Sequence, residues 1–471
     1  MKNKSKKIKM LKKQVQGITL IALVVTVIVL LILAGVAINL TVGDNGLFRR
    51  AQNAADTYQE ASEREAIELA VAGMQIGSMQ ETGMTKTELE NSLKDQFGDK
   101  ASVEDNEDGS FLVTIGESQY YVGEDWEIIE SSNMLEISSV EGLKTFRDDV
   151  NSGNSYEGKY VYLTNDITLD SSEEWEPIGY YSQDTESIRN VLENEKNKPF
   201  SGTFDGKGHT INNMYINTSN IVQGLFSLVI NGEIKNINIA ENCSINAGGS
   251  SGSVVGYMYN TGKISGCKNY ANLNHVNGGI VGTIAGSITV SDCINYGDIQ
   301  NGVGGIVGNS NGTNWEEFDN ESHKIINCVN FGAIKSTGEY AGGMVGYFKG
   351  NILNCCNKGT IIGGKTSGGI VGTMCGSVEN CYNISDIQGY RAAGILNAAT
   401  EGANAINCYS IGTITASGSK GDIIGGGNML EINKIINCYT KNDNFTAEDL
   451  GNVFENDIEN INGGYPILYW E

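Results

Sequence analysis

Histidines are the first residues to consider, because imidazole serves most often in proton transfer and as a zinc ligand. The sequence has three: His209, His275 and His323. None of them lies in an HExxH pattern, so zinc peptidase chemistry of that kind is not indicated. The sequence also has no GxSxG, P-loop or dinucleotide-binding pattern. His209 follows Asp205 in a glycine-rich stretch, and we expect it at a turn.

Carboxylates are abundant, and a pair of them could cleave a glycosidic bond if both faced one substrate. Glu173 and Glu174 are such a pair in the sequence. Adjacent residues on an extended segment point to opposite faces, so these two do not make a catalytic pair by themselves. We therefore expect a protein that is not an enzyme and has no catalytic residues, no cofactor and no metal site. The sequence has neither a CxxC motif nor a Cys/His cluster with zinc spacing.

Charge excludes one class of partner. The formal net charge is −24, although the first 17 residues carry seven lysines and no acid. So acidic a chain repels nucleic acid, which we do not expect as a partner.

Cysteines reveal the organisation of the chain. From Cys267 to Cys408 they recur at steps of 26, 35, 27, 26 and 27 residues, each within a phrase such as Cys293-Ile-Asn295-Tyr-Gly297. A GG(I/M)VG phrase precedes several of them. A fixed period of this size indicates stacked structural repeats. Cysteines in the same position of successive coils would lie about 4.8 Å apart and point the same way, so we expect free, buried thiols rather than disulfides.

The elements that place these residues are short strands with glycine or asparagine at the corners, where left-handed backbone is tolerated. The sequence therefore predicts a mainly β protein, a parallel β-helix of nine or ten coils over residues 160–445. The long step indicates an excursion at residues 311–324. It carries Trp315, Glu316, Glu317, Phe318 and Asp319, which could contact a ligand, although a neutral insertion is the alternative.

The N-terminal residues indicate a membrane anchor. After the basic leader 1–17, residues 18–38 form an uncharged apolar run long enough to span a bilayer as a helix. The leader lysines would remain cytoplasmic, which places the rest of the chain outside the cell. The alternatives are a plain signal anchor and cleavage after Ala37.

The remaining segments flank the anchor and the array. We expect the membrane helix and its amphipathic extension over 18–80 and a small helix-and-hairpin head over 81–130. A linker with a capping helix would occupy 131–159. The apolar segment 446–471 is expected to cap the last coil.

Two resemblances add to this interpretation. Gly17-Ile18-Thr19-Leu20-Ile21, between the lysines and the apolar run, resembles the N-terminal segment of type IV prepilins and pseudopilins of clostridia-like bacteria. The resemblance implies cleavage after Gly17 by a prepilin peptidase, methylation of Ile18 and contact with pilus assembly proteins. Ala22 stands where filament-forming pilins usually carry glutamate, which puts polymerisation in doubt.

The array is similar to the GLUG-motif β-helices of bacterial surface proteins, through FSGTFDGKGHTI at 200–211 and the repeated phrases. This likeness covers about 160–440 and implies the architecture. Together these observations favour a non-enzymatic surface protein, a minor pilin or adhesin on the cell surface that contacts a glycan or protein ligand. A surface-displayed glycan lyase or hydrolase and a passive spacer are the alternatives.

Overall fold

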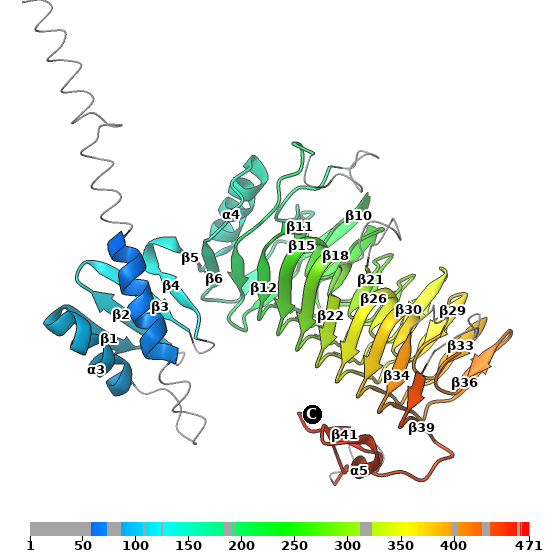
Figure 1. Ribbon diagram of the computed structural model, residues 1–471. Helices are drawn as coiled ribbons and strands as arrows, with labels where there is room; N and C mark the ends of the chain where they lie inside the picture. Colours follow the sequence, from blue (N-terminus) through cyan, green and yellow to red (C-terminus); the bar gives the residue numbers. More distant parts are fainter. Residues whose placement is uncertain are drawn as a thin grey trace, which may run out of the picture. The chain divides into compact units, whose positions relative to one another are not determined.

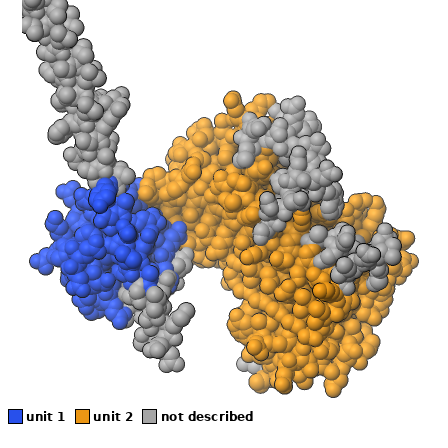
Figure 2. Space-filling model, viewed as in Figure 1, with its two compact units in different colours: residues 1–132 blue, residues 133–471 orange. Residues whose placement is uncertain are grey.

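The computed structural model describes residues 58–72, 86–106, 110–123, 126–182, 191, 194–310, 323–397, 403–425, 434–458, 462 and 464–470. The predicted membrane span, the processing residues Gly17 and Ile18, and the ligand-loop residues 315–319 lie outside these ranges. Within them, no helix is both long and apolar enough to cross a membrane. The chain divides into two compact units, residues 1–132 and 133–471 (Figure 2).

The first unit is a small α+β fold. Helical residues 58–72 and α3 (Lys86–Phe97) pack on an antiparallel sheet, and their buried residues include Ile67 and Leu89. The sheet runs in the order β1-β2-β3-β4. Its strands are β1 (Ala101–Asp105), β2 (Phe111–Ile115), β3 (Ser118–Val122) and β4 (Ile128–Glu130), with η1 (Gly98–Lys100) before β1. The helix and the hairpin expected within 81–130 are both present, as α3 and as β2 with β3.

The second unit is a parallel β-helix, as the period predicts (Figure 1). Its ten-stranded sheet takes one short strand from each of ten coils. In chain order the strands are β7 (Ile167–Thr168), β9 (Thr210–Asn212), β13 (Asn238–Ile239), β16 (Lys268–Asn269), β19 (Ile294–Asn295), β23 (Val329–Asn330), β27 (Cys356–Asn357), β31 (Tyr382–Asn383), β35 (Tyr409–Ser410) and β39 (Tyr439–Thr440).

A thirteen-stranded sheet forms a second side of the coils. It consists of β5 (Met134–Ile137), β6 (Tyr160–Leu163), β8 (Thr203–Asp205), β11 (Phe226–Ile230), β12 (Glu233–Lys235), β15 (Val255–Ser265), β18 (Val281–Ser291), β21 (Val307–Ser310), β22 (His323–Ile326), β26 (Val345–Leu353), β30 (Val371–Glu379), β34 (Asn404–Ile406) and β38 (Lys434–Ile436).

An eight-stranded sheet forms a third side, and a four-stranded sheet joins it in the later coils. The eight strands are β10 (Tyr215–Ile221), β14 (Ser244–Gly248), β17 (Leu273–Asn274), β20 (Ile299–Gln300), β24 (Ile334–Ser336), β28 (Ile361–Gly363), β32 (Ile387–Gly389) and β36 (Ile414–Ala416). The four are β25 (Tyr340–Gly342), β29 (Thr366–Gly368), β33 (Arg391–Ala393) and β37 (Lys420–Gly421).

The recurring cysteines line the interior. Cys267, Cys293, Cys328, Cys355 and Cys381 are fully buried in one continuous apolar core with isoleucine and valine. All nine cysteines whose side chains are described are free, in agreement with the prediction. Each thiol in the row donates to a nearby backbone carbonyl. The thiols therefore pack as small hydrophobic groups with a satisfied donor.

Two rows of asparagines stabilise the corners. In the inner asparagine ladder, each Nδ2 donates to Oδ1 of the asparagine in the next coil at 2.8 Å, through Asn269, Asn295, Asn330, Asn357 and Asn383. A second row adopts left-handed backbone, with φ near 53° at Asn327, Asn354 and Asn380. Buried amides are costly unless paired, and stacking pairs each with its neighbour.

The N-terminal end of the β-helix is covered by α4 (Val140–Ser152), which follows η2 (Ser131–Asn133). Gly142 N donates to Ser139 Oγ at 3.1 Å and so caps the start of the helix. Phe146 is buried, with its ring centroid 5.7 Å from that of Phe200 and 5.9 Å from that of Phe204. The helix therefore closes the first coils, as expected of a capping element.

The C-terminal segment, residues 446–471, does not cap the last coil end-on. It contains α5 (Ala447–Leu450) and the antiparallel pair β40 (Phe454–Glu455) and β41 (Ile467–Leu468). Leu450 and Leu468 join an apolar cluster with Cys356, Tyr382 and Tyr409 on the outer face of the ten-stranded sheet. Tyr382 and Tyr409, on successive rungs, give that side face large apolar side chains on which the segment packs.

Candidate functional site

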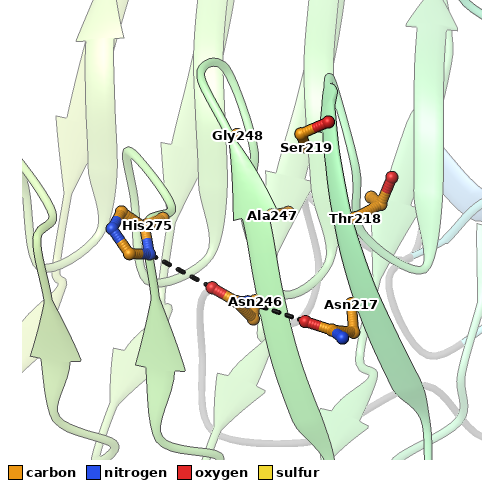
Figure 3. Close-up of a pocket in the computed structure, with 7 residues that line it drawn as sticks. All are labelled: Asn217, Thr218, Ser219, Asn246, Ala247, Gly248 and His275. Atoms are coloured by element: carbon orange, nitrogen blue, oxygen red, sulfur yellow. Dashed lines mark hydrogen bonds between the residues drawn. The ribbon is translucent and has the colours of Figure 1, made fainter.

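The side of the β-helix formed by the first strands of the eight-stranded sheet carries a polar pocket of about 430 Å³ (Figure 3). We call it the amide groove. Its lining residues come from β10, from β14 and from the corner after β17: Asn217, Thr218, Ser219, Asn246, Ala247, Gly248 and His275.

Asparagine amides run along the groove from coil to coil. Asn217, Asn246 and Asn274 are paired in register on three parallel strands. Asn246 Nδ2 donates to Asn217 Oδ1 at 2.7 Å, and Asn274 Nδ2 donates to Asn246 Oδ1 at 3.0 Å. The neighbouring Ile216 and Ile245 point into the core, so the alternation of a strand turns the amides outward.

His275 stands at the end of this row (Figure 3). Its Nδ1 lies 3.1 Å from Asn246 Oδ1, and its Nε2 lies 3.3 Å from Nδ2 of Asn301. Because Oδ1 can only accept and Nδ2 can only donate, the contacts fit a neutral ring with the proton on Nδ1. Two amides in different coils thus fix the tautomer and the orientation of the imidazole.

A carboxylate borders the groove. Glu174 Oε1 accepts from the backbone N–H of Asn217 at 3.0 Å. The adjacent Glu173 instead pairs with Lys144 at 2.8 Å. The two glutamates therefore engage different partners, as expected for neighbours on an extended segment, and only Glu174 reaches the groove. Glu174 lies beside the pocket, and the described residues that line the pocket itself include no Asp, Glu, Lys or Arg.

The other two histidines lie elsewhere. His209 is at the corner predicted from the sequence, with Nδ1 3.3 Å from Asp166 Oδ1. His323 opens β22, is fully buried, and its Nδ1 accepts from Ile288 N at 3.4 Å. The three histidines thus belong to different sheets or corners and do not form one site.

Asp205, four residues before His209 in the sequence, has a structural role. It is buried, and Oδ2 accepts from the Tyr160 hydroxyl at 2.5 Å. Its Oδ1 accepts from Lys207 N and from Asn236 Nδ2, at 2.8 and 3.1 Å. These hydrogen bonds fix the glycine-rich turn, and they use both oxygens of the Asp205 carboxylate. Within the described ranges, no group of three or more His, Cys, Asp or Glu side chains is placed to hold a metal ion.

Ligand contact was expected at residues 315–319, which lie outside the described ranges, and the amide groove was not expected from the sequence. The signal was present in the spacing: Asn217, Asn246 and Asn274 are 29 and 28 residues apart, which is one coil each. Corner and core residues recur with the same spacing. The spacing alone therefore does not show whether a residue lies on the surface.

No family model and no curated protein matches the sequence. Two solved structures do. One is a candidate immunoglobulin A1 protease from Bacteroides ovatus, with 19% identity and a TM-score of 0.42 over 72% of this chain and 94% of that chain. The other is named IgA1 protease, with 15% identity and a TM-score of 0.37 over 76% of this chain. This chain spans 26% of that second protein.

The expectation that the chain is not an enzyme is corrected by these matches, because both similar structures carry the names of proteases. The expectation had rested on missing sequence motifs, and a catalytic arrangement built from distant coils leaves no local motif. At these scores neither match supplies a substrate or catalytic residues for this chain.

Proposed function

We propose that this chain is an extracellular β-helical protein that binds a neutral glycan in the amide groove. The observation that carries the proposal is the row of outward amides at Asn217, Asn246 and Asn274. A glycan presents hydroxyl groups that both donate and accept, and amides offer the same pair of functions. The groove lining holds no charged side chain, so it favours an uncharged ligand over an anionic one.

The repeat geometry supports a chain-like ligand. Amides in adjacent coils lie about 4.8 Å apart along the axis, so a polymer lying along the β-helix would meet the same groups again at each coil. Thr218 and Ser219 add hydroxyls at one edge of the pocket, and His275 closes the other.

A binding experiment tests the proposal. Titration calorimetry with cellohexaose and mannohexaose would be performed on the full chain and on the double variant Asn246→Leu/His275→Leu. We expect saturable binding that weakens about tenfold or more in the variant, since a lost pair of hydrogen bonds costs at least about 1.4 kcal/mol. Gln388→Leu is the matched control, because Gln388 is exposed on the same outward row. Equal weakening in the control would contradict the proposal, as would a lack of any binding.

Turnover of the glycan at the same groove is the second candidate function. The observation that favours it is the approach of Glu174 to a groove that also holds an imidazole, since both groups can transfer a proton. Release of reducing ends by the wild type but not by Glu174→Gln would assign a glycan-active enzyme. Immunoglobulin A1 should be tested as a substrate in the same assay, because both similar structures are named for it. Cleavage of immunoglobulin A1 would indicate a protease instead of a glycan-active enzyme.

Attachment to the cell surface is a further part of the proposal. The resemblance of Gly17-Ile18 to a prepilin processing site supports it, together with the apolar run 18–38. Mass spectrometry of the mature protein should find an N-terminal methylated Ile18. An intact Met1 or a start at Ile38 would remove the prepilin route, and Ala22 makes incorporation into a filament a separate question.

A further inference from the structure

The outer face of the ten-stranded sheet carries two outward rows of side chains. The first row follows the paired strand positions and includes Ile294, Val329, Cys356, Tyr382 and Tyr409. The second row lies two residues further along each coil and contains Tyr270, Tyr296, Phe331, Lys358 and Ile384. The first row begins with the polar residues Thr210, Asn238 and Lys268 and is apolar from Ile294 onward. The middle and later coils of this face therefore form an apolar surface of the kind that is usually covered.

The later coils of this face are covered by the C-terminal segment. Tyr382 and Tyr409 are fully buried beneath it, and Leu468 packs in the same cluster. The Tyr409 hydroxyl donates to the Pro466 carbonyl, and Asn462 Nδ2 lies 2.6 Å from the same hydroxyl. The chain thus shows what this face binds: a segment rich in aromatic and aliphatic residues, folded as α5 and the β40–β41 pair. Its Pro466 carbonyl accepts a hydrogen bond from a phenol of the face.

The earlier coils of the same face are open. Tyr270, Tyr296 and Phe331, which we call the aromatic stack, are 40%, 41% and 41% exposed. A pocket of about 340 Å³ lies where the stack meets the C-terminal segment, and Trp470 forms its far wall. Large apolar side chains at that exposure, continuous with a covered face, mark a docking surface.

The geometry of the stack selects the kind of ligand. The ring planes of Tyr270 and Tyr296 are 5° apart with centroids separated by 4.7 Å, and Tyr296 and Phe331 follow at 3° and 5.0 Å. The Lys358 ammonium covers the far side of Phe331 at 5.5 Å from the centroid. The faces between the rings are therefore filled, and a ligand meets mainly ring edges and phenolic hydroxyls.

Ring edges carry the positive part of the aromatic quadrupole, so they pack against the face of another aromatic ring or a carbonyl oxygen. A sugar would instead need open ring faces on which to lie, and the stack offers one only at its end, on Tyr270. The phenols can donate to backbone carbonyls of an extended peptide, as Tyr409 does to Pro466. The rim of the pocket carries the polar side chains of Asp292, Asn327 and Lys358, and Asn327 Nδ2 donates to Asp292 Oδ1.

We propose that the aromatic stack and the adjoining Trp470 pocket bind an extended peptide segment of a partner protein, rich in aromatic, proline and aliphatic residues. The segment would continue along the sheet face that the C-terminal segment covers in the later coils. This site is on a different sheet from the amide groove, and it does not depend on the glycan proposal.

The probe is a fluorescein-labelled peptide with the sequence of residues 462–471, NGGYPILYWE, titrated into the full chain by fluorescence anisotropy. We expect saturable binding by the wild type and at least tenfold weaker binding by Tyr296→Ser/Phe331→Ser. Tyr390→Ser is the matched control, because Tyr390 is 56% exposed outside this cluster and its loss should leave the affinity unchanged. The peptide NGGSPILSSE, without aromatic rings, should not bind.

Three outcomes would overturn the proposal. One is an absence of binding up to about 1 mM peptide, the limit of a weak specific contact. Another is an affinity that the stack variant leaves intact, which would mean that the probe only replaces the C-terminal segment. The last is displacement of the peptide by cellohexaose, which would assign the stack to glycan instead.

Discussion

Gly305 lies directly against the inner asparagine ladder: a Cβ on Gly305 would be 2.5 Å from Cγ of Asn330 and 2.1 Å from the carbonyl oxygen of Gly343. Gly279 and Gly343 meet Asn295 and Asn357 in the same way. The GG phrase and the cysteine-asparagine phrase of the repeat are therefore one packing unit. The glycine is small because the amide ladder occupies the space that a side chain would need.

The first prediction concerns this contact. Gly305→Ala should lower the free energy of unfolding by about 3 kcal/mol or more, because backbone of the next coil must move to admit the methyl group. Urea unfolding of the full chain, followed by circular dichroism, measures the change. Gly338→Ala is the control, since the nearest atom to its added Cβ is Ser336 Oγ at 3.7 Å. A tolerated Gly305→Ala would show that adjacent coils can separate at little cost.

The second prediction concerns the ladder itself. Asn330 Nδ2 donates to Asn357 Oδ1, and Asn330 Oδ1 accepts from Asn295, although the Asn295–Asn330 step spans 35 residues. Asn330→Ala should cost about 2 kcal/mol, because amide groups in both neighbouring coils lose a buried partner. The urea midpoint is again the measurement. Asn444→Ala, at an exposed position, should change stability by less than about 0.5 kcal/mol.

The same ladder shows how far the sequence determines the fold. The cysteine spacing indicated the coils, and the asparagines and glycines indicated the corners. The step from Cys293 to Cys328 predicted an excursion at 311–324. Residues 311–322 lie outside the described ranges, whereas His323 and Lys324 belong to β22, so the array resumes two residues earlier than predicted. The register from Asn295 to Asn330 is unbroken. The strong period made these features predictable.

The outer surfaces were not predictable in the same way. Asn246 and Asn295 have the same residue type and nearly the same period, yet one lines an exposed groove and the other is buried. The C-terminal segment packs where it does because Tyr382 and Tyr409 lie on one outward row. Predicting that row from the sequence would require the strand register of all three sheets. The spacing of residues shows that they belong to successive coils. Which side of the coil a residue occupies depends on the path of the backbone around that coil.

The third prediction concerns pH and the buried thiols. Burial raises the pKa of the Cys293 thiol well above its ordinary value, and the neighbouring Cys267 and Cys328 thiols add to the rise. In the unfolded chain this thiol titrates near about 8.5. Above that pH the unfolded state loses a proton that the folded state keeps, so stability must fall as pH rises.

The wild type should therefore lose stability between pH 8.5 and 10 more steeply than Cys293→Ala, by a slope difference that approaches about 1.4 kcal/mol per pH unit toward pH 10 for the one thiol removed. The slope is the readout, since the substitution also leaves a small cavity that lowers stability at every pH. Asn444→Ala should keep the wild-type slope. Equal slopes in the wild type and Cys293→Ala would mean that the thiol ionises in the folded protein.

The fourth prediction concerns the C-terminal segment. Leu468 is fully buried against the outer face of the ten-stranded sheet and pairs with Phe454 across β40 and β41. Leu468→Asp places a charge in that apolar contact, so the segment should detach while the coils, with their own core, remain folded. Brief chymotrypsin digestion should then cut at Phe454 and release the segment at least tenfold faster than in the wild type.

Ile458→Asp changes the same segment at a position that is 92% exposed, and digestion should proceed at the wild-type rate. Because Trp470 would leave its place beside Phe331, its fluorescence should shift to longer wavelength in Leu468→Asp alone. Digestion of both variants at one rate would show that the contact with Tyr382 and Tyr409 does not hold the segment in place.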